Sequence, residues 1–225
     1  MLFWISSLAA LTVAYLFGSI PTGYLAGRVL RGIDIRQHGS GSTGATNVLR
    51  ILGKWPALVV LLVDVAKGAA AVLFANWLAG CIAVAESTAA ATALQLQTIV
   101  PWVASLAGLA ALLGHGRSIW LGFAGGKSAA TGLGVLLAMS WPVGLGALAV
   151  FGIALAASRT VSLSSILASL TAIVLVFALE QPLPYRLLVV AGGVYVIMRH
   201  RTNIQRLLAG TEPRLGQTSP AAKSE

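Results

Sequence analysis

Long stretches of this sequence carry no formal charge. Residues 1–27, 87–116 and 128–158 contain no Asp, Glu, Lys or Arg, and all three are rich in Leu and Ala. A helix of roughly 20 apolar residues is long enough to cross about 30 Å of hydrocarbon. A water-soluble domain needs charged surface at shorter intervals, so runs of this length predict helices that span a membrane.

The composition supports the same interpretation. Of the 225 residues, 57% are hydrophobic and only 9% are charged, with a mean hydropathy of +0.88. We expect an all-α fold: a polytopic membrane bundle of about seven transmembrane helices. Residues 1–212 form one domain, and residues 213–225 form a disordered tail, because this segment is polar and rich in small residues.

The residues that interrupt the apolar runs set the boundaries of the expected spans. Pro21 should kink or loosen the end of the first span, and Trp141-Pro142 should divide residues 128–158 into two short helices. The first of these two helices need not cross the whole bilayer. The expected spans are residues 2–20 or 2–27, 55–80 and 99–114, the two halves of 128–158, then 161–179 and 185–198.

The net charge of +9 does not indicate a nucleic-acid partner. The basic residues lie at the ends of apolar runs, and no soluble stretch interleaves Arg with aromatic residues. Cytoplasmic loops of membrane proteins carry an excess of Lys and Arg. The asymmetry therefore predicts an outside N-terminus, a cytoplasmic C-terminus and Gly-rich loops that all face the cytoplasm.

The segment HGSGSTGATN, residues 38–47, is small and polar between apolar runs. It contains G-x-G-x-x-G, but a dinucleotide site needs a βαβ unit, which cannot form between membrane helices. Glycines can still aim successive N–H groups at one anion, and Thr46 or Asn47 can cap a following helix. The alternative is an ordinary turn. Arg50 favours the anion site, because its guanidinium grips two phosphate oxygens.

A second such segment is Gly125-Gly126-Lys127, at the start of an apolar run. It lacks the spacing and the preceding strand of a P-loop. Two interpretations remain open: a phosphate cradle with Lys127 as its charge, or a lysine that anchors the helix end at the interface.

Several other polar residues accompany the spans. Asp64 and Lys67 are three residues apart in an apolar run, which favours a structural ion pair. Ser162 and Ser165 begin a later span, where they cap it or donate to a ligand. His200 and Asn203 open a basic helix. No cluster of acidic residues or His/Cys spacing predicts a metal site, and no metal or cofactor is expected.

Taken in order, the segments GSIPTGYLAG, GSGSTGATNVLR, DVAKG, GGKSAATG, SLSSI and HRTNIQRLLAG resemble one family. They are similar to the bacterial acyl-phosphate:glycerol-3-phosphate acyltransferases, the PlsY family, over about residues 13–212. The H-x4-D signature of the soluble-type glycerolipid acyltransferases is missing.

The resemblance implies seven spans in the bacterial inner membrane and an active site on the cytoplasmic side. It implies transfer of an acyl group from acyl phosphate to the sn-1 hydroxyl of glycerol 3-phosphate, giving lysophosphatidic acid and phosphate, with coupling to the enzyme that makes acyl phosphate. The implied catalytic residues are Ser40, Arg50, Lys127, His200 and Asn203. The implied phosphate-binding residues are Gly41, Ser42, Gly44, Ala45, Thr46, Asn47, Gly125, Gly126 and Ser165.

The chain departs from the family pattern at three places. The family usually has Asn where Ser42 stands and Gly where Ser128 stands, and it has a Pro within the segment that reads GHGRSIW here. We expect these changes to tune the site. Two rival functions stay open from the residues alone: a transporter or channel for an organic phosphate, which the absence of a visible internal repeat disfavours, and a purely structural membrane subunit.

Overall fold

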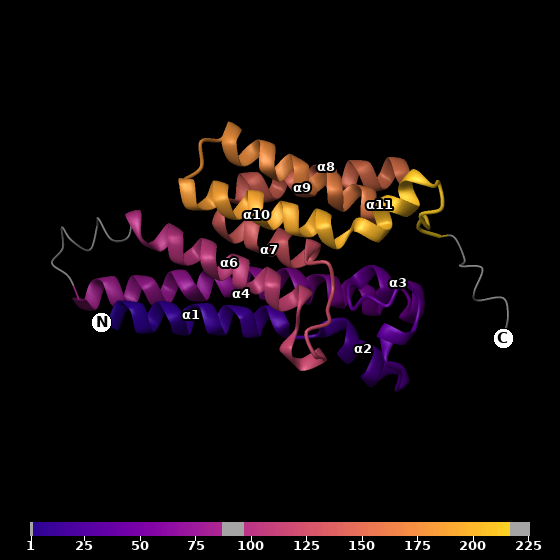
Figure 1. The fold of residues 1–225 in the computed structure, drawn as a ribbon, viewed down its shortest axis with the longest axis horizontal. Helices are drawn as coiled ribbons and strands as arrows, with labels where there is room; N and C mark the ends of the chain where they lie inside the picture. The colour runs from indigo at the N-terminus through magenta and orange to yellow at the C-terminus, as the bar shows by residue number, and fades with distance from the viewer. Residues whose placement is uncertain (1, 87–96, 217–225) are drawn as a thin grey trace.

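The computed structural model describes residues 2–86 and 97–216, and this part of the chain is helical (Figure 1). The long helices lie side by side along the long axis of the molecule. Residues 22–52 and 201–208 lie toward the end opposite to the N-terminus (Figure 1).

The first group of long helices consists of α1 (Leu2–Ser19), α4 (Lys54–Glu86) and α6 (Val100–Gly116). Each packs on the other two, through a core made largely of alanine. Small side chains let helix backbones approach closely, which is how helices associate where lipid removes the hydrophobic driving force.

The second group consists of α8 (Trp141–Ser158), α9 (Val161–Ala178) and α10 (Leu183–Arg199). The short helix α7 (Ala129–Met139) connects it to the first group, because α7 packs on both α4 and α8. The α4–α7 contact is tight: a Cβ on Gly134 would lie 1.9 Å from the carbonyl oxygen of Val65.

Each expected span corresponds to a helix among the described residues. Four segments are long and apolar enough to cross a membrane: Ile5–Arg31, Lys54–Ile82, Trp141–Ser158 and Val161–Ala178. At about 1.5 Å per residue, α7 rises about 16 Å, roughly half of the hydrocarbon thickness. The expected break at Trp141-Pro142 is confirmed, since α8 begins at Trp141 after the extended residue Ser140.

The polar segment after α1 is more ordered than a loop. The helix α2 (Thr22–Arg31) starts after the break at Pro21, and η1 (Ile35–Gln37) and α3 (Ala45–Leu52) follow. A further short turn, η2 (Ile119–Leu121), lies between α6 and α7. The expected basic helix is α11 (Arg201–Leu208).

The expected tail begins inside the described structure. Leu215 donates its backbone N–H to the carbonyl of Arg159 at 2.7 Å, so the chain stays attached to the end of α8 beyond residue 212. The remainder of the expected tail, residues 217–225, lies outside the described residues, as does most of the connection between α4 and α6.

Candidate active site

The first Gly-rich loop is folded around the side chain of Asn47, which is 1% exposed. Its Oδ1 accepts the backbone N–H of Ser40 at 2.9 Å. Its Nδ2 lies 3.1, 3.1 and 2.9 Å from the carbonyl oxygens of Ile35, His38 and Ser42. Asn47 therefore shapes the loop, and its amide is engaged with backbone groups.

The loop leads directly into the N-terminus of α3. The residue before the helix is Gly44, and no side chain caps the first turn, so the expectation that Thr46 or Asn47 caps this helix is wrong. Both lie inside the first turn, where Asn47 reaches back to the loop. Gly44, Ala45 and Thr46 line a cavity, and a helix N-terminus with open N–H groups favours an anion.

The second Gly-rich segment rests on His115, at the end of α6. Gly126 donates its N–H to the carbonyl of His115 at 3.0 Å. A Cβ on Gly126 would lie 2.1 Å from Nε2 of His115, and one on Gly125 would lie 2.2 Å from the His115 carbonyl oxygen. Only glycine fits at both positions, because the turn lies directly against this histidine.

The other side of this turn is held by Arg199, at the end of α10. Its NH2 lies 2.9 Å from the carbonyl oxygen of Gly126 and 3.2 Å from that of Gly125. The next residue but one, Ser128, has a left-handed backbone with φ of +63°, and its Oγ donates to the carbonyl of Leu112 at 2.8 Å. A left-handed backbone favours glycine, so Ser128 holds a conformation that residues with a Cβ rarely adopt.

Lys127 extends from this turn to Asn203 of α11. Its Nζ donates to Oδ1 of Asn203 at 2.5 Å, and Nδ2 of Asn203 donates to Glu212 at 2.6 Å. Glu212 also accepts from Ser162 at 2.7 Å and from Arg206 at 2.7 Å. A chain of hydrogen bonds thus joins the second Gly-rich segment to α9 and α11.

Sequence reasoning missed Glu212. It follows the helix-ending Gly210 by two residues and stands at the end of the expected domain, where no motif indicates a role. One sequence feature could have indicated a role for Glu212: it is the one carboxylate between Arg199 and Arg214, among several basic residues.

Burial and hydrogen bonding set the protonation states of Lys127 and Glu212. It lowers the pKa of Lys127 to about 8, with Glu212 opposing the shift and nearby arginines adding to it. Burial raises the pKa of Glu212, but hydrogen bonds from Asn203, Ser162 and Arg206 outweigh this and leave it below its usual value. Glu212 is therefore a carboxylate at neutral pH, and Lys127 is close to its titration point.

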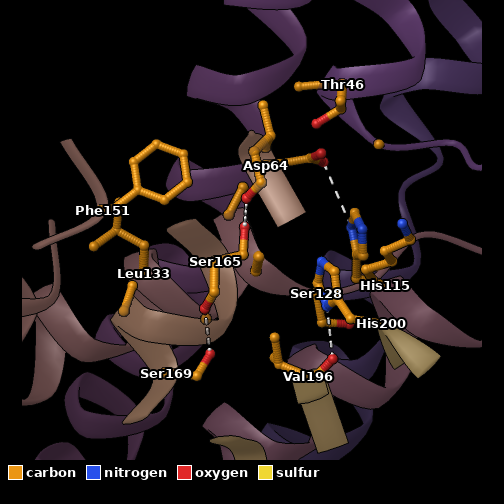
Figure 2. Close-up of a pocket in the computed structure, with 18 of the residues that line it drawn as sticks. Thr46, Asp64, His115, Ser128, Leu133, Phe151, Ser165, Ser169, Val196 and His200 are labelled. Carbon is orange, nitrogen blue, oxygen red and sulfur yellow. Dashed lines mark hydrogen bonds and ion pairs between the residues drawn. The ribbon is translucent and has the colours of Figure 1, made fainter. Parts of the chain in front are cut away.

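His200 lies at the junction of α10 and α11 and is 3% exposed. Its Nδ1 is 2.8 Å from the carbonyl oxygen of Val196, so Nδ1 carries the hydrogen and Nε2 is the free acceptor (Figure 2). Burial lowers the pKa of His200 to about 4, and the imidazole is neutral at pH 7.

Arg50 and Ser165 complete the expected set. Arg50, on α3, lines the cavity and has no hydrogen bond to another described side chain that would hold its guanidinium. Ser165 lines it from α9, and its Oγ donates to the carbonyl of Val161 at 2.9 Å. Neither Ser162 nor Ser165 caps α9, which has Thr160 before its first turn.

The expected ion pair between Asp64 and Lys67 is confirmed, with Oδ1 and Nζ 2.8 Å apart and both side chains almost fully buried. Thr22 donates to the same carboxylate at 2.6 Å, and Lys67 donates to the carbonyl of Ile20 at 2.8 Å. Nδ1 of His115 is 3.6 Å from Asp64, which connects the ion pair to the second Gly-rich segment (Figure 2).

These elements surround one cavity of about 430 Å³. At one end it is lined by polar residues: Ser40, Ser42, Thr46, Asn47, Arg50, Lys127, Ser165, His200, Asn203 and Glu212. It continues between α7, α8, α9 and α10, where the walls are apolar and include Leu133 and Phe151 (Figure 2).

Three expected phosphate-binding glycines lie elsewhere. Gly41 and Gly125 line a second cavity on the other side of the first loop, and Gly126 is buried against His115. Across the described parts of the chain, no group of three His, Cys, Asp or Glu side chains is placed to hold a metal ion.

The comparisons with known proteins agree with this arrangement. The family profile described as glycerol-3-phosphate acyltransferase matches residues 8–210. The chain is 70% identical to glycerol-3-phosphate acyltransferase 2 of Rhizobium johnstonii, over 97% of this chain and 100% of the relative. It is 56% identical to a glycerol-3-phosphate acyltransferase of a Synechococcus species, over 95% and 96%.

Two crystal structures of PlsY (YgiH), described as an integral membrane glycerol 3-phosphate acyltransferase, share the fold. The glycerol 3-phosphate form has a TM-score of 0.80 and 36% identity, and the lysophosphatidic acid form has 0.77 and 37%; each covers 94% of this chain and 96% of that one. The fold is thus shared along nearly the whole length, and the chain belongs to the glycerol-3-phosphate acyltransferase family of integral membrane proteins.

Proposed function

We propose that this protein transfers an acyl group from acyl phosphate to the sn-1 hydroxyl of glycerol 3-phosphate. The products are lysophosphatidic acid and inorganic phosphate. The observation that carries the proposal is the single cavity that joins a cationic, hydroxyl-rich end to a long apolar end. A substrate with a phosphate head and a fatty chain needs both environments at once, and the related structures are described with glycerol 3-phosphate and lysophosphatidic acid.

The polar end supplies two phosphate contacts. The first turn of α3, together with Ser40 and Ser42, offers N–H and hydroxyl donors to the phosphate of the acyl donor. Arg50 and Lys127 face the same space and bind the glycerol 3-phosphate. The apolar walls between α7 and α10 hold the acyl chain, which keeps the reacting carbonyl at the boundary between the two regions.

The transfer needs little chemistry from the protein, because acyl phosphate is an activated donor. The sn-1 oxygen attacks the acyl carbon, and the bond from that carbon to the phosphate oxygen breaks. The hydroxyl proton passes to a phosphate oxygen of a substrate or to Nε2 of His200. His200 is a weak base, because burial holds its pKa at about 4. Positioning and the charges of Arg50 and Lys127 carry most of the rate enhancement.

The proposal also includes the membrane that holds the protein and the side on which the cavity opens. With the Lys- and Arg-rich end of the bundle in the cytoplasm of a bacterium and the bundle in the inner membrane, the cavity opens where glycerol 3-phosphate is soluble. The acyl phosphate arrives from the enzyme that makes it, and the coupling between the two reactions is through that lipid-like intermediate.

The test is a purified protein in detergent, with labelled glycerol 3-phosphate and either acyl phosphate or acyl-CoA as donor. We expect labelled lysophosphatidic acid with acyl phosphate and none with acyl-CoA alone. EDTA should leave the rate unchanged, because the proposed roles need no metal. Equal turnover with acyl-CoA would contradict the donor assignment, and a loss with EDTA that Mg²⁺ restores would contradict the metal-free mechanism.

A further inference from the structure

A second cavity, of about 400 Å³, lies behind the wall formed by the two Gly-rich segments. It shares Ser40, Ser42 and Lys127 with the main cavity. Its other walls come from the end of α6 and from the junction of α10 and α11, and they include Arg117, Tyr195 and Arg201. The two cavities are therefore separated by the residues that we assign to phosphate binding.

The charge of this second cavity is of one sign. Four cationic side chains line it, Arg117, Lys127, Arg199 and Arg201, and no carboxylate does. Arg199 is fixed by the carbonyl oxygens of Gly125 and Gly126. Arg117 and Arg201 are exposed, and no ion pair to another described residue neutralises either of them. A concave surface with several unneutralised cations attracts a compact anion.

Tyr195 forms part of the wall of this cavity. It lines the cavity from α10, and its hydroxyl is buried without a hydrogen-bond partner in the described structure. It is packed so closely over Gly116 that a Cβ there would lie 1.9 Å from the hydroxyl oxygen. The hydroxyl is closed off against Gly116, so Tyr195 contributes a wall of the cavity and no hydrogen bond to its ligand.

We propose that the second cavity is a binding site for inorganic phosphate, held by Arg117 and Arg201. The inference rests on the proposed function, in which each turnover releases one phosphate from the acyl donor. Lysophosphatidic acid is retained by the apolar cavity and the bilayer, whereas phosphate is soluble only in water. The polar cavity gives the phosphate an aqueous route that begins at Ser40, Ser42 and Lys127, the residues which both cavities share.

The test is equilibrium binding of radiolabelled inorganic phosphate to the purified full-length protein in detergent. The assay needs no turnover, so it gives a result whether or not the acyltransferase activity is found. We expect phosphate to remain bound when glycerol 3-phosphate saturates the main cavity. Complete displacement of phosphate by glycerol 3-phosphate would overturn the proposal, because it would place all the binding in the main cavity.

One double variant locates the site. Arg117→Ala with Arg201→Ala should weaken the residual phosphate binding by about tenfold or more, since each charged hydrogen bond removed is worth at least that factor. Unchanged phosphate affinity in the double arginine variant would overturn the assignment.

The matched control removes the same charge from the same end of the bundle. Arg31 and Lys54 are exposed and line neither cavity, so Arg31→Ala with Lys54→Ala should leave phosphate affinity within about twofold. An equal loss in this control would show a general charge effect and overturn the site. Lysophosphatidic acid, added in place of glycerol 3-phosphate, should not displace the residual phosphate; displacement would assign the cavity to a lipid headgroup.

Discussion

Lys127 shows how one residue of this protein acquires its chemistry from packing. The glycines before it fit against His115 and Arg199, which fixes the turn, and Asn203 then holds the ammonium. Burial lowers the pKa of Lys127 to about 8. Its charge is therefore present at neutral pH and is lost in a range where most lysines remain protonated.

The pH dependence of the reaction follows from this value. A lysine binds phosphate only while protonated, so activity depending on Lys127 falls as pH rises through about 8. We expect kcat/KM for glycerol 3-phosphate to fall about tenfold between pH 7 and pH 9, whereas the substrate phosphate titrates near pH 6. Initial rates corrected for donor hydrolysis would test this. A flat profile to pH 10 would show that Lys127 has an ordinary pKa or no role.

Conservative exchanges separate phosphate binding from membrane anchoring. Arg50→Lys keeps the charge but loses the fork that holds two phosphate oxygens, and Lys127→Arg places a larger group in the Gly-Gly turn. Each should lower kcat/KM by about tenfold or more, which is about 1.4 kcal/mol of transition-state stabilisation. An interfacial anchor would tolerate both. Near-normal kinetics for both variants, at normal membrane levels, would remove these residues from the site.

At the scale of an element, α4 illustrates how a polar cluster is placed inside an apolar helix. Asp64 and Lys67 form an ion pair on α4. Thr22 at the start of α2 and His115 at the end of α6 complete the group around Asp64. Every charge in this cluster has a partner. Removing one member would leave the other charge buried and unpaired, which costs more than removing both.

This reasoning gives a stability prediction. Asp64→Asn should destabilise the protein by about 3–5 kcal/mol, because the ammonium of Lys67 then lacks its counter-ion. The double variant Asp64→Leu with Lys67→Met should lose clearly less. Thermal unfolding in detergent compares the two. If the double variant were the less stable one, the cluster would be stabilising the fold beyond charge compensation.

The sequence was sufficient to predict the helices but not the contacts between them. Pro21 and Trp141-Pro142 act locally on the backbone, so the breaks they cause were predictable. Asn47 and Glu212 act through partners brought close only by folding: Asn47 binds backbone groups of its own loop, and Glu212 binds side chains of α9 and α11. Residue types and spacing therefore indicated the phosphate-type site without showing which polar groups hold it together.

At the scale of the whole molecule, the two Gly-rich segments come to the same end of the bundle, together with α2, α3 and α11 (Figure 1). The basic residues of these elements predict that this end faces the cytoplasm. Gln37 and Phe123 are exposed there and provide reporters of orientation.

Cysteine labelling tests that orientation. In a Cys81→Ser background, Gln37→Cys and Phe123→Cys should resist a membrane-impermeant thiol reagent in intact cells. Both should react once the membrane is opened, which controls for accessibility of the thiol itself. Labelling of either position in sealed cells would reverse the predicted orientation.

The central claim is that the joined polar and apolar cavity transfers an acyl group and does not conduct a phosphate compound across the membrane. The direct measurement uses proteoliposomes, labelled glycerol 3-phosphate outside, and acyl phosphate in the bilayer. We predict that the label becomes extractable into the lipid phase as lysophosphatidic acid, and that Lys127→Ala abolishes this conversion. Label that accumulates inside the vesicles as unchanged glycerol 3-phosphate, with none in the lipid phase, would contradict the account.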